Sequence, residues 1–218
     1  MSKIIIFGTK ENSELAQFYL NNDSEHEVIA FCVDGKYLCS NTFKGLPVVA
    51  FEEIEKDYPT TMCKFIAPLA PTSMGIIRKE VFNRICEKGY DFISYVSSRA
   101  TNFSSHIGKN CFILEDNTLQ PYTTIGDNVI MWSGNHIGHH SVIRDHVSIT
   151  SHVVISGRCD IGSNSFFGVN STVRDGVKVA EGTFISLGAV ITADTVPWSV
   201  YKGASAELTK IPSMRVKF

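Results

Sequence analysis

Charged residues are scarce in this chain of 218 residues: Asp, Glu, Lys and Arg make up 19% of it, and the formal net charge at pH 7 is −2. There is no basic run and no cluster of aromatic and arginine residues, so we expect no nucleic acid partner. No apolar run approaches the roughly 18 residues that a bilayer-spanning helix needs. The first eight residues predict a strand rather than a signal peptide. We therefore expect a cytoplasmic protein with no membrane insertion.

Paired cysteines are also missing. The six cysteines, at positions 32, 39, 63, 86, 111 and 159, form no CxxC pair. CxxC pairs are typical of zinc sites and redox motifs, and disulfides are rare in a reducing cytoplasm. The pattern predicts buried free thiols and no metal site.

A large apolar residue recurs at every sixth position over more than a third of the chain. The run has no exception; its members are Ile107, Ile113, Leu119, Ile125, Met131, Ile137, Ile143, Ile149, Ile155, Ile161, Phe167, Val173, Val179, Ile185 and Ile191. Four residues after each of these anchors stands a small or compact side chain, such as Cys111, Ser141 or Thr183. Gly follows the anchor at 108, 126, 138, 162 and 168, where we expect turns.

Period six predicts a triangular solenoid. An amphipathic helix repeats every 3.6 residues, and a β-sandwich alternates every two residues over short strands, so neither fits. Each hexad gives one short strand and a corner, and three hexads make a coil. One coil cannot bury its apolar side alone, so neighbouring coils stack around a shared core. The fifteen anchors predict five coils.

The first 98 residues predict a small Rossmann-like α/β domain with a parallel sheet. Strand-like runs lie at 4–7, 28–33, 45–49, 62–66 and 92–96, and the segment around Leu15, Phe18 and Tyr19 predicts a helix. A second helix has the apolar stripe Ile77, Val81, Phe82, Ile85 and Cys86, and Gly89 is expected to end it. Ligands of such sheets bind beyond the carboxyl ends of the strands, here near Gly8 and Asp34. Residues 99–218 then form the β-helix and a C-terminal tail.

The hexad pattern resembles that of the hexapeptide-repeat acyltransferases, which implies left-handed coils, against the usual right-handed crossover rule. Before the solenoid, Val33-Asp34, the 45–48 segment, Arg78 and Gly89-Tyr90 are similar to one group of this family. These are the two-domain sugar acetyltransferases, typified by the sialic acid O-acetyltransferases and the bacillosamine-pathway N-acetyltransferase. The resemblance implies acetyl-CoA as co-substrate, a sugar or nucleotide sugar held by the first domain, and a homotrimer.

Five of the seven histidines fall between positions 136 and 152. His139, Ile143 and Asp145 match the family motif His-x-x-x-Ile-x-Asp, which implies that His139 is the catalytic base, in a cleft between two subunits. From the inward phase of its neighbours, we expect His139 on a flat outer wall. An imidazole with a pKa near 6.5 suits proton removal from an amine or hydroxyl that attacks a thioester. His140 is the alternative base, and Asp145 either orients an imidazole or is an ordinary corner residue.

Two regions are expected to hold the acceptor. Trp132, Asn135 and His136 are candidates near the histidine motif, although the family often has a small polar residue in place of Trp132. Gly8, Thr9 and Asp34 are candidates in the first domain. Here the turn is Gly8-Thr9-Lys10-Glu11-Asn12 where the family has Gly-x-Gly-Gly-His, so the backbone can approach a pyrophosphate less freely. The turn either binds a ligand or the domain is a scaffold.

The coenzyme is expected at the C-terminal coils. The segment 186–191 resembles the family's Gly-Ala-x-Val, and 201–206 resembles its Gly-x-Pro-Ala turn, with Ser205 in place of Pro. A glycine lets an extended thiol arm lie against the chain, although Gly188 also fits an ordinary corner. The resemblance implies coenzyme-binding roles for Gly157, Gly168, Gly188, Ala189, Lys202 and Gly203.

The sequence thus predicts an acetyl-CoA-dependent acetyltransferase acting on a sugar, with the amine of a nucleotide-linked amino sugar for surface glycan biosynthesis as first choice. O-acetylation of a sialic acid-type sugar is the alternative. Two other classes fit less well. The γ-type carbonic anhydrases share this solenoid, but they bind zinc with a pair of histidines five residues apart, which this chain lacks. A non-catalytic scaffold is favoured only by the altered Gly8 turn.

Overall fold

Runs of branched apolar residues form the expected sheet in the first part of the chain. The computed structural model describes residues 1–208 and 211–215. The sheet has the order β3-β4-β2-β1-β5, all parallel except the short edge strand β3. Its strands are β1 Lys3–Phe7, β2 Glu27–Val33, β3 Thr42–Phe43, β4 Leu46–Ala50 and β5 Cys63–Ile66. Short 3₁₀ turns lie at Gly35–Tyr37, Phe51–Lys56 and Thr72–Gly75.

Two helices of the first domain were predicted at the right places. They are α1, Glu11–Asn22, and α2, Ile76–Glu87, which Gly89 follows at φ +83°. The predicted apolar stripe of α2 is wrong at its ends, because Ile77 and Cys86 are exposed. Arg78 is fully buried instead, since this face of α2 points at the second domain rather than at solvent.

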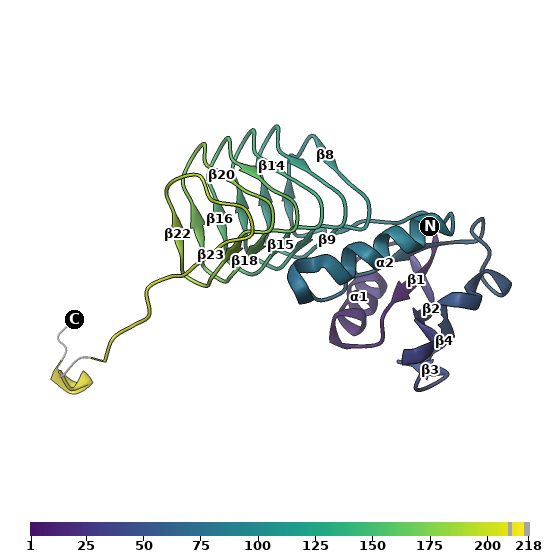
Figure 1. Ribbon diagram of the computed structural model, residues 1–218. Helices are drawn as coiled ribbons and strands as arrows, with labels where there is room; N and C mark the ends of the chain where they lie inside the picture. Colours follow the sequence, from purple (N-terminus) through teal and green to yellow (C-terminus); the bar gives the residue numbers. More distant parts are fainter. Residues whose placement is uncertain (209–210, 216–218) are drawn as a thin grey trace.

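The second domain is a left-handed parallel β-helix with three faces (Figure 1). The first face contains β6 Tyr95–Val96, β9 Phe112–Ile113, β12 Ile130–Met131, β15 Ser148–Ile149, β18 Phe166–Phe167, β21 Phe184–Ile185 and β23 Val200–Tyr201. The second face contains β7 Thr101–Asn102, β10 Thr118–Leu119, β13 His136–Ile137, β16 Val154–Ile155, β19 Thr172–Val173 and β22 Val190–Ile191. The third face contains β8 His106–Ile107, β11 Thr124–Ile125, β14 Val142–Ile143, β17 Asp160–Ile161 and β20 Lys178–Val179.

The hexad anchors form the core of the β-helix, which confirms the predicted fold. Every anchor from Ile113 to Ile191 is buried in one continuous cluster, and the compact residues at the other register are buried from Cys111 to Ala189. The three corners follow from this register. Corner 1 (such as 108–111 and 144–147) precedes the first face, corner 2 (such as 132–135 and 186–189) precedes the second, and corner 3 (such as 138–141 and 156–159) precedes the third.

Each corner turns on a left-handed residue three positions after the anchor. This holds for Asn110, Asp116, Tyr122, Asn128, Gly134, His140, His146, His152, Arg158, Asn164, Asn170, Gly176, Gly182 and Gly188. The N–H of each of these from Asn128 on donates to a carbonyl nineteen residues earlier, as His140 does to Pro121 at 3.3 Å. Asn, Gly, Asp and His tolerate this conformation best, which accounts for three corner histidines in succession.

The glycines that follow anchors serve a different purpose from the expected one. Their φ angles are not positive; instead, a Cβ at Gly138 would lie 2.5 Å from the Gly157 nitrogen of the next coil. At Gly168 it would lie 2.4 Å from the Leu187 nitrogen. These positions are glycine because adjacent coils stack there backbone against backbone.

The β-helix begins earlier than the predicted boundary at residue 98. Phe92 still bridges to Phe65 of the α/β sheet, whereas β6 already pairs with β9 in the first face. The first coil escaped the six-residue pattern because β8 follows β7 after five residues, and Asn102 stands where an apolar anchor is expected. At the other end the described tail leaves the body of the β-helix (Figure 1).

The first domain packs on the first face and on corner 1. Tyr19 of α1 joins Tyr95, Phe112 and Ile130 in a shared apolar cluster. Arg78 of α2 donates from Nη2 to the carbonyl of His146 at 2.8 Å and to Oγ of Ser148 at 2.8 Å. Burial lowers the pKa of Arg78 to about 10. The two domains therefore share buried contacts instead of being joined only by a linker.

Stacked corner amides continue this interface. Asn110 Nδ2 donates to Asn128 Oδ1 at 2.8 Å, and Asn128 Nδ2 lies 3.0 Å from His146 Nδ1. Asn164 follows in the next coil and donates to the Met74 carbonyl. His146 is thus the single imidazole in a column otherwise occupied by Asn and, at 182, Gly. Burial lowers the pKa of His146 from 6.5 to about 4.

Acid should destabilise the protein through His146. Above pH 6.5 the imidazole is neutral in both states; as pH falls towards 4, only the unfolded chain takes up the proton. A pKa lowered from 6.5 to about 4 corresponds to roughly 3 kcal/mol of stability lost between these pH values. His146→Asn keeps the left-handed corner and the amide column but cannot titrate. Urea unfolding at pH 7 and at pH 4 measures how much the free energy of unfolding falls between the two pH values. The fall should be smaller by roughly 3 kcal/mol in the variant than in the wild type; equal falls in the two proteins would contradict the assignment.

The remaining observations concern cysteines and membranes. All six cysteines are free, and Cys32, Cys63, Cys111 and Cys159 are buried as predicted, whereas Cys39 and Cys86 are exposed. Within residues 1–208 and 211–215, no helix has the length and apolar character to cross a bilayer.

Candidate functional site

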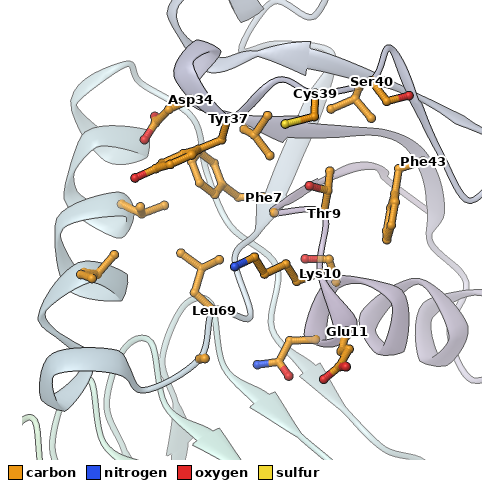
Figure 2. A pocket seen from close by; sticks show the side chains of 18 of the residues that line it. Phe7, Thr9, Lys10, Glu11, Asp34, Tyr37, Cys39, Ser40, Phe43 and Leu69 are labelled. Carbon is orange, nitrogen blue, oxygen red and sulfur yellow. The ribbon is translucent and has the colours of Figure 1, made fainter.

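A large pocket opens at the carboxyl edge of the α/β sheet (Figure 2). Its volume is about 1040 Å³, and it lies between the ends of β1 and β2, the start of α1 and one side of α2. Gly8, Thr9 and Asp34 all line it, as expected if ligands bind beyond the carboxyl ends of parallel strands. Gly8 has φ +114°, and a Cβ there would lie 2.6 Å from the buried Ser13 Oγ. Gly8 is thus required for the turn itself.

The pocket has cationic and aromatic walls. Lys10 extends across it towards Leu69, and Tyr37 and Phe43 stand on opposite sides (Figure 2). The Lys10 ammonium forms no hydrogen bond or ion pair with any residue that the structure describes. Lys36 lies 4.9 Å from the Tyr37 ring centroid. The N-terminus of α1 has no side-chain cap, and its first residues, Glu11 and Asn12, line the same pocket. Free cations, open N–H groups and aromatic rings together suit an anionic ligand with a flat ring.

The carboxylate of Asp34 is not free to bind a ligand. Both of its oxygens accept from Arg84, at 2.5 and 3.3 Å, and Arg84 also lies over the Phe51 ring at 4.8 Å. Asp34 stands on the pocket rim, but its charge is already balanced by this ion pair. The Asp34 carbonyl also accepts the Tyr37 N–H at 2.7 Å, which closes the 35–37 turn.

His139 and His140 lie side by side in corner 3, between β13 and β14, and not on a flat wall. The expected wall was wrong because period six gives the spacing of corners but not their phase. The two Nδ1 atoms are 3.0 Å apart, and the ring planes are nearly perpendicular, at 88°. Gln120 Oε1 accepts the His139 backbone N–H at 2.9 Å. The His140 ring packs on Tyr122, with centroids 4.7 Å apart.

Gly157 lies directly against the His139 ring. A Cβ at Gly157 would be 2.9 Å from both Cε1 and Nε2 of His139, and 3.0 Å from Oδ1 of Asp175. The structure therefore brings one predicted coenzyme residue and the predicted base together. Asp145 is elsewhere: it lies in corner 1, and its Oδ1 accepts the Asp127 backbone N–H at 2.8 Å. Asp145 thus stacks coils and does not orient an imidazole in this structure.

The other predicted coenzyme residues gather at corner 2 in the last coils. A Cβ at Gly203 would lie 2.5 Å from the Leu187 carbonyl oxygen and 3.0 Å from the Ala189 nitrogen, and Gly168 stacks beneath Leu187. Lys202 is exposed beside them. Gly188 has φ +64° and open space where a Cβ would be. At Gly188 a thin extended chain can approach the backbone, because no side chain occupies that position.

Of the three predicted acceptor residues near the histidines, only His136 faces outwards, half-buried on the second face. Asn135 is 1% exposed, and its Oδ1 accepts the Val153 N–H at 2.8 Å, so it belongs to the stacking of the coils. Trp132 packs against the apolar cluster between the domains. The expectation that Asn135 and Trp132 contact an acceptor does not fit this placement.

The pocket and His139 lie on opposite sides of the chain. The first domain covers the first face and corner 1, whereas corner 3 is the vertex opposite the first face. Every residue that lines the pocket precedes the β-helix. A ligand held in the pocket of one chain therefore cannot be expected to reach His139 of the same chain.

Several residues of these sites were missed from the sequence. Lys10 follows the same strand end that pointed to Gly8, and Gln120 lies one coil before His139, a spacing of nineteen that the repeat could have supplied. Tyr37, Phe43 and Asp175 gave no comparable signal, because loop and tertiary contacts bring them in. Among the residues that the structure describes, no three His, Cys, Asp or Glu side chains are grouped to hold a metal ion.

These features define a class by fold: an α/β domain with a carboxyl-edge pocket, followed by a hexapeptide β-helix with an exposed corner histidine pair. No family model matches the chain, and no curated protein sequence does. Solved structures do match it.

Solved structures from several bacteria share this two-domain fold. The acetyltransferase domain of PglB from Neisseria gonorrhoeae is 16% identical, with a TM-score of 0.78 over 94% of this chain and 100% of its own. PerB from Caulobacter crescentus, solved in complex with CoA and GDP-perosamine, is 15% identical, with a TM-score of 0.78 over 93% of this chain and 98% of its own. WeeI from Acinetobacter baumannii is 16% identical, with a TM-score of 0.55 over 87% and 96%. At such identities the likeness shows the fold.

Proposed function

We propose that the protein is an acetyl-CoA-dependent acetyltransferase that modifies the amino group of a nucleotide-linked amino sugar. The observation that carries the proposal is the outward His139–His140 pair on a β-helix whose fold is that of PerB, which was solved with CoA and GDP-perosamine. The proposal places the protein among the two-domain sugar acetyltransferases and in the cytoplasm, in a pathway that builds surface glycans.

The pocket supports a nucleotide sugar as acceptor. A nucleoside diphosphate joins a flat base to two charged phosphates, and Tyr37, Phe43 and Lys10 offer an aromatic and a cationic surface to such a ligand. Gly8 and Thr9 would contact the phosphates through the backbone, and Asp34 would act through the turn that it holds. His136 remains the candidate acceptor contact on the β-helix.

The base chemistry follows from the corner. His139 Nε2 takes a proton from the acceptor amine as the nitrogen attacks the thioester carbon; the C–N bond forms, the C–S bond breaks, and the thiolate leaves. A backbone N–H near Gly157 would donate a hydrogen bond to the developing oxyanion. Coenzyme A would lie along corner 2, where Gly168, Gly188, Ala189 and Gly203 keep the surface low, with Lys202 beside it.

A homotrimer belongs to this proposal. An apolar strip on the second face and corner 2 is exposed, comprising Val154, Val169, Leu187 and Val190. Strips of this kind mark interaction surfaces. Covering the strip with a second copy would bring corner 3 of one chain towards another chain, so that a pocket and a His139 from different subunits complete one site. Sedimentation should give three times 24.1 kDa.

The test is thiol release from acetyl-CoA with a panel of nucleotide-linked amino sugars, free amino sugars and free sialic acids. We expect turnover with a nucleotide-linked amine and not with the free sugars. Lys10→Glu should raise the acceptor KM about 10- to 100-fold, the cost of losing a charged hydrogen bond, and leave the acetyl-CoA KM unchanged.

Lys3→Glu is the matched control, because it makes the same charge change at the other, exposed end of β1. Turnover confined to sialic acids would replace the proposal by O-acetylation. If no acceptor in the panel causes thiol release, the proposed function is refuted. Equal acceptor KM values for Lys10→Glu and Lys3→Glu would refute the role of the pocket.

A further inference from the structure

We propose that His140 is the positioning residue of the base: a neutral imidazole that accepts the Nδ1–H of His139 and thereby leaves His139 Nε2 free to take a proton. The inference rests on the proposed function and assigns to a second histidine the task for which an enzyme commonly uses a carboxylate.

The first step of the argument is the contact itself. Two imidazole Nδ1 atoms 3.0 Å apart must share one hydrogen, so one ring donates and the other accepts. In the described part of the chain, neither ring forms a hydrogen bond or ion pair with a carboxylate. Asp175 of a later coil also faces the Gly157 position, with Oδ1 3.0 Å from where a Cβ would be, and it pairs with Arg158 at 3.9 Å. Tyr122 faces His140 from the preceding coil.

The surroundings of the two rings decide which of them donates. His139 is half-buried, with Nε2 against Gly157, and Gln120 holds its backbone. His140 is exposed, with its ring against Tyr122. A base needs a defined position and a free lone pair, which His139 Nε2 has only when the hydrogen is on its own Nδ1. His140 Nδ1 is then the acceptor, and its hydrogen lies on Nε2, towards solvent.

The charge balance during proton transfer supports the same assignment. When His139 Nε2 takes the proton from the amine, the positive charge of the imidazolium is shared through Nδ1–H with the His140 lone pair. The proton returns from His139 Nε2 to the leaving thiolate, and both rings regain their starting tautomers. If His140 itself becomes protonated, it has no lone pair at Nδ1 and the base loses its acceptor.

The left-handed corner makes a clean experiment possible. His140 has φ +59°, which Gly and Asn both adopt without strain. His140→Asn places Oδ1 where Nδ1 stands and so keeps a neutral acceptor. His140→Gly removes it, and His140→Asp replaces it by an anion. We expect kcat within about threefold of wild type for Asn, and a loss of about tenfold or more for Gly, the cost of one hydrogen bond to a charged group. For Asp, the acidic limb of the kcat–pH profile should move to higher pH.

A measurement without substrate separates this inference from the proposed function. Nitrogen-15 NMR of the free protein reports which nitrogen of His139 carries the hydrogen. We expect the hydrogen on Nδ1 in the wild type and in His140→Asn, and a mixture of tautomers in His140→Gly. Wild-type kcat and tautomer in His140→Gly would overturn the positioning role, as would a His140→Asn protein that behaves like His140→Gly. If no acceptor is turned over but the tautomers follow this pattern, the proposed function fails and the pairing stands.

Discussion

Alanine in place of His139 is expected to lower kcat by about 10²- to 10⁴-fold, the usual contribution of a general base. The KM for acetyl-CoA should change little, because the coenzyme residues lie mainly at corner 2, on the other side of the second face. Steady-state kinetics on a protein of unchanged mass and unfolding curve is the measurement, since a change in kcat alone marks an interaction made in the transition state.

His106→Ala is the control for this substitution. His106 is an exposed histidine on the third face, so the same chemical change there should leave kcat within about twofold, as is usual for surface sites. A folded His139→Ala protein that retains more than about a tenth of wild-type kcat would show that another group takes the proton. His140, the alternative base, would then be the next residue to replace, because its ring lies directly beside that of His139.

Phe167→Ala should destabilise the β-helix by about 3–5 kcal/mol, the usual cost of deleting a buried aromatic ring. Phe167 is an anchor with no exposed surface, and the coils above and below cannot move to fill the space because their strands, β15 and β21, both pair with β18. Urea or thermal unfolding at a fixed protein concentration measures the loss, which should lower the Tm by about 10 °C or more.

The neighbouring residue provides the control. Phe166 lies on the same strand but points outwards and stacks on Phe184, with centroids 4.9 Å apart and rings 11° from parallel. Phe166→Ala should cost only about 1 kcal/mol, the value of an aromatic pair near the surface. Similar losses from the two substitutions would mean that the anchors do not face the interior.

The sequence predicted the β-helix well because a repeat restates one spatial rule many times. A single hexad is ambiguous, but fifteen in register leave only one way to bury the anchors. The same logic failed where the rule changes: the coil that begins at Tyr95 has one side a residue short, so it lay outside the pattern. Period six also carries no information on phase, which is why the wall predicted for His139 is a corner.

The candidate sites were predictable where backbone topology alone decides the position. Parallel strands end at one edge, so Gly8, Thr9 and Asp34 were expected together and lie together. What side chains do there depends on partners far apart in sequence. Asp34 meets Arg84, Asn135 turns inwards to Val153, and Arg78 is buried although charged residues on a helix ordinarily face solvent. None of these contacts follows from spacing.

The separation of the pocket from His139 has a consequence for how activity depends on concentration. If each site takes its pocket from one chain and its base from another, a single chain has no complete site. Dilution below the dissociation constant of the assembly should then abolish turnover by mass action. Two inactivating substitutions on different chains can also complement each other. In trimers assembled from Lys10→Glu and His139→Ala chains, some sites combine an intact pocket with an intact base, so two impaired proteins recover activity when they are unfolded and reassembled together.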